Sequence, residues 1–174
     1  MITIIIGTNR QHAKSRVVAG WIHEMLKEKG EDSQFVDMAD LPPDVTASAL
    51  YEHSGTNEAF NQLVEKMRPS EKFFFIVPEY NGSFPGVLKT FIDGQTYPSP
   101  FQGKKAALIG ISSGMQGGGL ALSHLTDVLH YLGMQVLAQK PKLAFIEKNL
   151  EGEGLKNALY EQLLTEQMEA FLSF

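Results

Sequence analysis

Cationic and hydroxyl side chains follow the first apolar run of the chain, and together they suit an anion. Arg10, Lys14 and Ser15 come shortly after the β-branched residues 2–6, and apolar residues at helical spacing begin a few positions later. The free amides and the dipole at a helix N-terminus both favour an anion, and phosphate is the common example. The residues that we expect to form this phosphate site are Thr8, Arg10, Lys14 and Ser15.

The same cations could instead form a solvated basic face, in which Arg16 would join Arg10 and Lys14. Their position directly after a buried strand favours the phosphate site, because ligands of open α/β sheets bind at the carboxyl ends of the strands. Two familiar phosphate motifs do not match. A P-loop would need glycine where Thr8 and Ala13 stand, and a dinucleotide fingerprint would need further glycines.

A second polar turn follows the most apolar segment of the chain. Residues 73–77 include no polar side chain, which is typical of a strand covered on both faces. Pro78 ends the hydrogen-bond ladder because it has no amide hydrogen. The backbone amides, the Asn81 side chain and the Tyr80 ring of the following turn suit the edge and face of a flat heteroaromatic ring. Alternatively, Asn81, Gly82 and Pro85 only make a turn and a helix start. The polar residues of this turn are Glu79, Tyr80, Asn81, Gly82 and Ser83.

A third loop, residues 112–119, is rich in glycine and follows the apolar residues 106–111. Glycine lets the backbone approach a ligand closely. The same region spells Gly-x-Ser-x-Gly around Ser112, the nucleophile elbow of hydrolases. That enzyme class needs an acid and a histidine on later loops, but neither histidine nor aspartate occurs after Gly133. We therefore disfavour a hydrolase.

The elements that must position these loops alternate between strands and helices. The expected strands are residues 2–6, 34–38, 73–77, 106–111 and 134–138. Five helices are expected. The first has Ser15 as its cap and the second has Thr56 or Asn57. The third starts near Pro85, the fourth follows Gly119, and the last spans 154–172. This alternation predicts an α/β fold, a three-layer doubly wound parallel sheet of five strands in the order 2-1-3-4-5. In that order the first two loops flank one crevice and the third closes its other side.

The long polar connection 40–56 is expected to be a flap over the site, and residues 95–104 an extended surface loop. One domain, 1–174, suits a chain of this length with 43% hydrophobic residues. A net charge of -5 and scattered cations argue against nucleic-acid binding. We expect no membrane span, no metal site among the five histidines, and a cytoplasmic location, because no signal peptide is evident.

Two motifs carry a resemblance to a known family. They are Gly7-Thr8-Asn9-Arg10 with Val18, Ala19 and Trp21, and Pro78-Glu79-Tyr80-Asn81-Gly82-Ser83 with Pro85-Gly86, Leu88-Lys89 and Ile92-Asp93. With them the chain resembles the NAD(P)H-dependent FMN reductases, flavodoxin-like flavoproteins that include quinone, azo and chromate reductase relatives. The resemblance covers nearly the whole chain, and the second motif is the more specific.

The resemblance implies FMN as bound cofactor and NADPH or NADH as electron donor. Thr8, Arg10 and Ser15 would hold the FMN phosphate, with Lys14 as a further charge. Pro78, Glu79, Tyr80, Asn81 and Gly82 would line the isoalloxazine, and Ser112, Gly114 and Gly117 would lie beside its other edge. Members form homodimers or homotetramers with flavin sites near subunit interfaces, so Tyr51 or Tyr97 would reach a neighbouring flavin.

For the reaction, the resemblance implies that hydride passes from the nicotinamide to flavin N5 and that electrons then pass to a small acceptor such as free flavin or a quinone. The protein needs only to orient and shield the bound flavin, so we nominate no catalytic acid or base. The alternative is a flavodoxin-like electron carrier without its own NAD(P)H turnover. Carriers of this fold tend to have a Thr- and Ser-rich phosphate loop and a strongly acidic surface. Here the first loop holds Arg10 and Lys14, and the net charge of -5 is modest.

Overall fold

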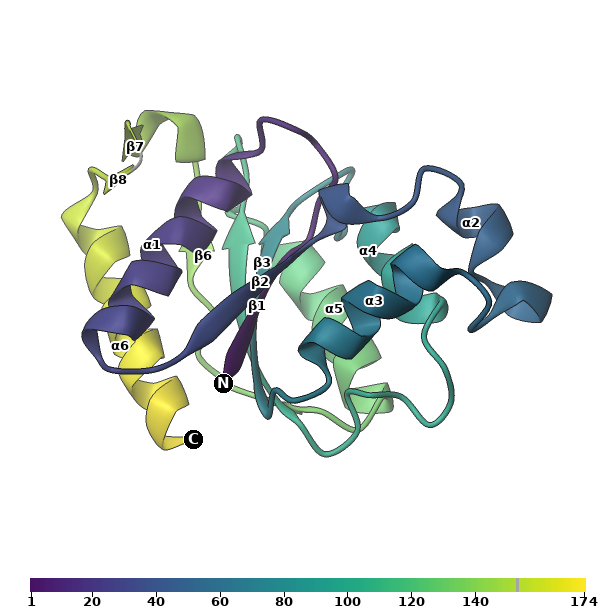
Figure 1. The fold of residues 1–174 in the computed structure, drawn as a ribbon. Coiled ribbons are helices and arrows are strands. Elements are labelled where there is room, and N and C mark those ends of the chain that lie inside the picture. The colour runs from purple at the N-terminus through teal and green to yellow at the C-terminus, as the bar shows by residue number, and fades with distance from the viewer. Residues whose placement is uncertain (153) are drawn as a thin grey trace.

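A computed structural model describes residues 1–152 and 154–174 and contains a central parallel sheet between two layers of helices (Figure 1). The strands are β1 (Ile2–Ile6), β2 (Ser33–Asp37), β3 (Lys72–Pro78), β4 (Lys105–Ile111), β5 (Gln135–Val136) and β6 (Lys142–Leu143). Their order is β2-β1-β3-β4-β5, and β6 also pairs with β4. The predicted fold class and strand order are confirmed.

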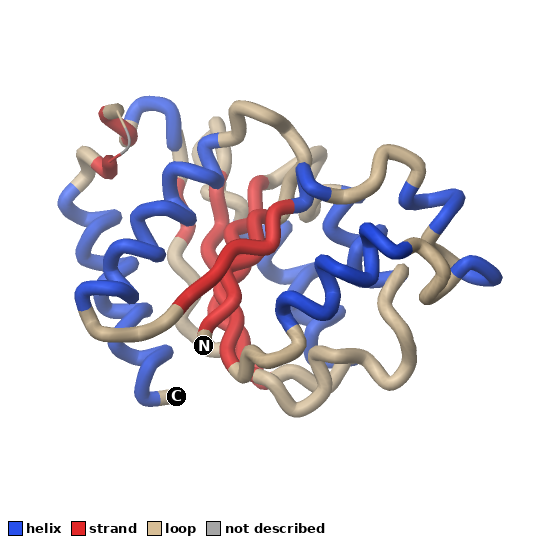
Figure 2. The backbone as a smooth tube through the Cα atoms, in the orientation of Figure 1, coloured by secondary structure: helices blue, strands red, loops and turns tan. Residues whose placement is uncertain are grey.

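The main helices are α1 (Lys14–Glu28), α3 (Glu58–Met67), α4 (Gly86–Asp93), α5 (Gly119–Tyr131) and α6 (Ala158–Ser173). Figure 2 shows them in blue on both sides of the red strands, with α1 and α6 on one face and α3, α4 and α5 on the other. Alternate side chains of β3 feed the two cores. Phe74 and Ile76 belong to the α1 and α6 side, whereas Phe73, Phe75 and Val77 belong to the opposite side. Burial on both faces explains why this strand is apolar throughout.

The fifth strand differs from the predicted span 134–138, because it is split into two short pieces. β5 pairs with the start of β4 and β6 pairs with its end. Pro141 lies between the pieces and has no amide hydrogen for a ladder. The fully buried side chain of Gln167 in α6 fills the gap, since its amide donates to the carbonyl oxygens of Leu108 and Gln139 at 2.9 and 3.0 Å.

The connection after β2 is not the flap that the sequence predicted. It folds into the short turns η1 (Met38–Asp40), α2 (Val45–Ser48) and η2 (Tyr51–His53). Leu41, Ala49 and Leu50 are buried in the core on the α3 side. Apolar side chains at these positions hold the connection against the body of the protein, on the far side of α3 and α4 in Figure 1.

Several helix ends follow the sequence signals. Gly30 ends α1 with φ 76°, and the Asn57 side chain caps α3 by accepting from the Phe60 amide at 2.9 Å. The predicted start of the last helix at residue 154 is wrong, because β7 (Leu150–Glu151) pairs with β8 (Gly154–Leu155) and α6 begins after its cap, Asn157. Among the helices of the described residues, none is long and apolar enough to cross a membrane.

Candidate functional site

A cavity of about 280 Å³ opens at the carboxyl ends of β1, β3 and β4, where the predicted crevice should lie. Predicted site residues that line it are Arg10, Lys14, Ser15, Pro78, Glu79, Tyr80 and Ser112. Lining residues that were not among the predicted ones are His12, Ala13, Ile111, Ser113, Ile146 and Glu147. The loops after three separate strands therefore converge on one space.

Helix α1 begins at this cavity with an open N-terminus. Its cap residue is Ala13, whose methyl side chain has no acceptor for the first amides. Ser15 was the predicted cap, and that prediction is wrong, because Ser15 lies inside the helix and is 2% exposed. The first amides of the helix remain available for an external acceptor. Lys14 is exposed beside them and adds a positive charge.

Thr8 lies behind the cavity and joins the first loop to the second. Its hydroxyl is fully buried and lies 2.6 Å from the hydroxyl of Tyr80. The same oxygen accepts from the Arg10 amide at 3.3 Å. The guanidinium carbon of Arg10 lies 6.0 Å from the centroid of the Tyr80 ring, within the range of a cation–π contact. Thr8 therefore positions Tyr80 and the backbone around Arg10.

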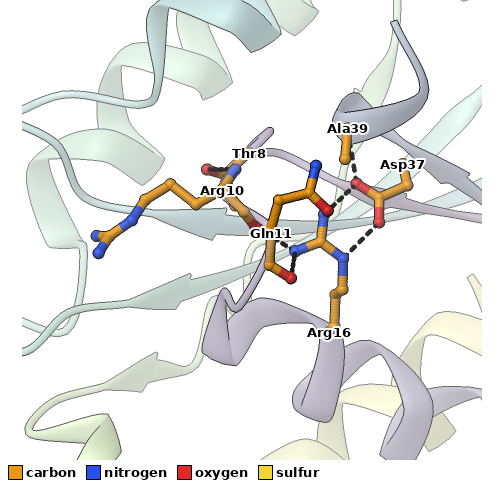
Figure 3. Close-up of polar contacts among 6 residues, drawn as sticks. All are labelled: Thr8, Arg10, Gln11, Arg16, Asp37 and Ala39. Atoms are coloured by element: carbon orange, nitrogen blue, oxygen red, sulfur yellow. Dashed lines mark hydrogen bonds and ion pairs between the residues drawn. The ribbon is translucent and has the colours of Figure 1, made fainter.

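Arg16, the third cation of the predicted basic cluster, is not part of the cavity lining. Its guanidinium donates to both carboxylate oxygens of Asp37, at 2.7 and 2.8 Å (Figure 3). The Arg10 side chain extends away from this pair in the same view. The loop is thus not a uniform basic face: Arg10 and Lys14 face the cavity, whereas Arg16 is paired behind it.

The second loop combines a cavity wall with a tight turn. Tyr80 and Ser83 exchange two backbone hydrogen bonds, at 2.8 and 3.1 Å. Between them Asn81 and Gly82 have φ of 51° and 77°, which is the pattern of the Asn-Gly turn of a hairpin. Asn81 and Gly82 were predicted to contact the ligand, but they lie outside the residues that line the cavity, which comprise described residues only. Their visible role is to make the turn.

The glycines of the third loop pack against the protein itself. A Cβ on Gly117 would lie 2.6 Å from the backbone of Lys142, and one on Gly118 would lie 2.9 Å from the Ile111 amide. Gly114 and Gly117, predicted as ligand contacts, likewise lie outside the lining residues, all of which belong to the described part of the chain. These glycines let the loop lie close to the end of the sheet.

Ser112 fixes this loop and is engaged in a local hydrogen-bond network. Its hydroxyl donates to the carbonyl of Gly114 and accepts from the amide of Gly117, both at 2.8 Å. His124, the histidine nearest to it in sequence, is paired with Ser83 at 3.0 Å. This arrangement gives no support to the hydrolase alternative, in which Ser112 would be activated by a histidine.

A segment that the sequence did not single out forms one wall of the cavity. The Ile146 amide donates to the carbonyl of Ser112 at 3.1 Å, and the Phe145 amide donates to the carbonyl of Gly114 at 3.0 Å. Phe145 has φ 48°, a strained value for a bulky residue. The Asn149 side chain donates to the carbonyl of Phe145 at 3.0 Å and holds the segment in place. Ile146 and Glu147 are thereby fixed at the cavity.

The cavity also holds two carboxylates, those of Glu79 and Glu147. Oε2 of Glu79 is buried and has no hydrogen-bond partner among the residues that the structure describes. A buried acceptor without a donor is costly, so such an atom indicates a missing partner, such as a ligand or water. Glu79 is therefore a candidate contact for a donor group on a ligand.

Tyr51 and Tyr97, which the sequence placed near a neighbouring subunit's site, lie away from this cavity. Their exposed fractions are 82% and 99%. Neither belongs to the residues that line the cavity within the described part of the chain. They are available for contact with another molecule.

The strand order and the place of the cavity define a flavodoxin-like fold with a candidate site at the carboxyl ends of its strands. Residues 1–145 match the family model of NADPH-dependent FMN reductase. The chain is 32% identical over 136 residues to an NAD(P)H-dependent FMN reductase of Pseudomonas aeruginosa, covering 73% of each chain. It is 31% identical over 147 residues to a 2-hydroxy-1,4-benzoquinone reductase of a Burkholderia species, covering 82% of this chain and 76% of the relative.

Among solved structures, the fold is similar to that of a flavoenzyme NAD(P)H:acceptor oxidoreductase of Paracoccus denitrificans. The TM-score is 0.79 at 22% identity, with 99% of this chain and 94% of the other covered. The chain belongs to the NADPH-dependent FMN reductase family, whose curated relatives are oxidoreductases. Ile146 and Glu147 lie just beyond the family match, which is why no family motif points to them.

Proposed function

We propose that this protein is an FMN-dependent oxidoreductase that passes hydride from NADPH or NADH, through bound FMN, to a small acceptor such as free flavin or a quinone. The observation that carries the proposal is the cavity in which the open N-terminus of α1 meets Pro78, Glu79 and Tyr80. Family membership and the names of the relatives support the same chemistry.

The first loop fits the phosphate end of FMN. The amides at the start of α1 face an external acceptor because Ala13 provides no cap. Arg10 and Lys14 add two cations at the same cavity. Charge-assisted hydrogen bonds to a phosphate are stronger than neutral ones. We therefore assign the phosphate to the amides of Lys14 and Ser15, with Arg10 and the Lys14 side chain as counter-ions.

The second loop fits a flat ring that carries hydrogen-bond donors. Pro78 and Tyr80 line the cavity, and Tyr80 is held by Thr8 at 2.6 Å. The unpartnered Oε2 of Glu79 would gain a donor from a ring imide or a ribityl hydroxyl. Ser112 and Ile146 line the same cavity. The polar groups of the cavity thus suit a phosphorylated ring system that carries hydrogen-bond donors.

When bound, FMN supplies the redox chemistry, since it accepts hydride from a nicotinamide and passes the electrons on. The residues that line the cavity would bind and orient the FMN and shield it from water. Backbone amides at the ring edge would stabilise negative charge there. No side chain is assigned as a catalytic acid or base.

We further propose that the protein acts as a homodimer or homotetramer in the cytoplasm, where its nicotinamide donor is found. Exposed tyrosine side chains support self-association, because tyrosine is enriched at protein interfaces. Tyr51, Tyr97 and Tyr131 are 82%, 99% and 91% exposed. Sedimentation of the purified protein tests this part of the proposal, which a single-chain mass would contradict.

The experiment that tests the activity begins with a flavin spectrum of the purified protein, with added FMN if needed. Under anaerobic conditions NADPH or NADH should bleach the flavin absorbance, and a quinone should restore it. Repeated turnover with the quinone distinguishes a reductase from a carrier, which would need a protein partner for its reduction. A protein that does not bind FMN, or whose flavin neither nucleotide reduces, would contradict the proposal.

A further inference from the structure

Arg16 and Asp37 form a paired arrangement directly behind the first loop (Figure 3). Nε and Nη2 of Arg16 donate to the two oxygens of Asp37 at 2.7 and 2.8 Å. The side chains are 27% and 16% exposed, so the pair is partly shielded from water. Asp37 ends β2 and its carboxylate also accepts from the Ala39 amide at 2.9 Å. The pair is therefore anchored to the sheet.

The remaining nitrogen of the guanidinium holds the backbone of the first loop. Nη1 of Arg16 donates to the carbonyl of Gln11 at 3.1 Å and also to the carbonyl of Arg10. The Arg10 carbonyl additionally accepts from the Ala13 amide at 3.2 Å. One side chain thus connects the end of β2 to two consecutive peptide groups of the loop.

These contacts fix the direction of the amides in that loop. Among the described residues the only cis peptide is Tyr97–Pro98, so the peptides that follow Arg10 and Gln11 are trans. In a trans peptide the carbonyl and the next amide point in opposite directions. Since both carbonyls point at Arg16, the amides of Gln11 and His12 point away from it. His12 and Ala13, which follow these peptides, line the cavity, whereas Arg16 does not.

We propose that Arg16 and Asp37 are positioning residues for the phosphate of the cofactor, which they orient without touching it. This inference rests on the proposed function, because it assumes that FMN places its phosphate at the first loop. Arg16 holds the loop that leads into the start of α1, whose first amides face the anion, and Asp37 holds Arg16 and neutralises its charge. The affinity for the phosphate then depends on a pair that lies outside the cavity lining.

The test compares FMN with riboflavin, which lacks the phosphate. Arg16→Lys keeps the charge but loses the fork geometry, and Asp37→Asn keeps the shape but loses the charge. We expect both variants to bind FMN about tenfold more weakly, the loss that corresponds to one charge-assisted hydrogen bond. Riboflavin affinity should stay within about twofold, since the ring contacts are unchanged. Flavin fluorescence titration measures both.

The matched controls are Arg68→Lys and Glu65→Gln, which alter an exposed Arg–carboxylate pair with a 2.7 Å contact on α3. They should leave both affinities as in the wild-type protein. The proposal is overturned if Arg16→Lys and Asp37→Asn leave FMN binding unchanged, or if FMN and riboflavin affinity fall in parallel with Tm. The latter result would identify the pair as a general stabilising contact.

A wild-type protein that binds neither flavin would contradict the proposed function, and hydrogen exchange then tests the positioning role separately. Exchange of the amides of Arg10 and Ala13, which donate to the Thr8 hydroxyl and the Arg10 carbonyl, should be about tenfold faster in both variants, because the loop loses its anchor. Unchanged exchange rates would overturn the positioning role whatever the cofactor.

Discussion

Arg10 is the guanidinium that faces the cavity, 6.0 Å from the Tyr80 ring, while Arg16 is held by Asp37. We expect Arg10→Ala to weaken FMN binding by about tenfold or more, because one charge-assisted partner of the phosphate is lost. Riboflavin binding should change little. Lys27→Ala removes an exposed cation of α1 that pairs with Glu24, and should leave FMN affinity unchanged. Equal effects of the two substitutions on FMN affinity would argue against a phosphate at the first loop.

The hydroxyl of Tyr80 stabilises the site through Thr8, which is fully buried. Tyr80→Phe leaves the Thr8 hydroxyl without this partner, and we expect the free energy of unfolding to fall by about 1 kcal/mol. Tyr131 is 91% exposed, so Tyr131→Phe is the matched control and should change the free energy of unfolding little. Urea unfolding of the three proteins measures the difference. A Tyr80→Phe variant as stable as the control would show that the 2.6 Å contact contributes nothing.

Helix α6 completes the sheet where the fifth strand is split. Gln167 donates to two carbonyls there, so Gln167→Met should lower the free energy of unfolding by roughly 1–3 kcal/mol, because those carbonyls lose their donor in a buried region. Gln162→Met alters an exposed glutamine of the same helix that pairs with Glu166, and should have little effect. Thermal unfolding, monitored by circular dichroism, compares the two variants. A Tm for Gln167→Met equal to that of Gln162→Met would contradict this role.

Lys72 at the start of β3 holds the C-terminal end of α6, donating to the carbonyls of Phe171 and Leu172 at 2.9 and 2.7 Å. Burial lowers the pKa of Lys72, the nearby charge of Lys105 lowers it further, and Glu31 opposes both. The unfolded chain therefore binds more protons than the folded one between the lowered pKa and the usual value, and the free energy of unfolding rises with pH across that window.

Lys72→Met removes this contribution. From neutral pH to about pH 10.5, its free energy of unfolding should therefore rise less with pH than that of the wild-type protein. Denaturant unfolding at a series of pH values measures the two slopes. Lys66→Met, which alters an exposed lysine of α3, should follow the wild-type slope. Parallel profiles for Lys72→Met and the wild-type protein would show that Lys72 titrates alike in both states.

For the molecule as a whole, the sequence predicts those features of the fold that depend on local residue patterns. The apolar run of β3 and the alternation of elements predicted the doubly wound sheet, and its strand order brings the first two loops together. The pairing of Arg16 with Asp37 was not predictable, because it depends on the end of β2 lying beside the first loop. Gln167, whose side chain fills the gap in the split fifth strand, lies far along the chain, and Ile146 and Glu147 carry no motif.

The central claim is that the start of α1 and the loops after β3 and β4 hold one phosphorylated flavin. A crystal structure of the protein with FMN tests it most directly. We predict phosphate oxygens within about 3 Å of the amides of Lys14 and Ser15, and the ring beside Pro78 and Tyr80. FMN bound elsewhere, or with its phosphate away from the start of α1, would contradict the account.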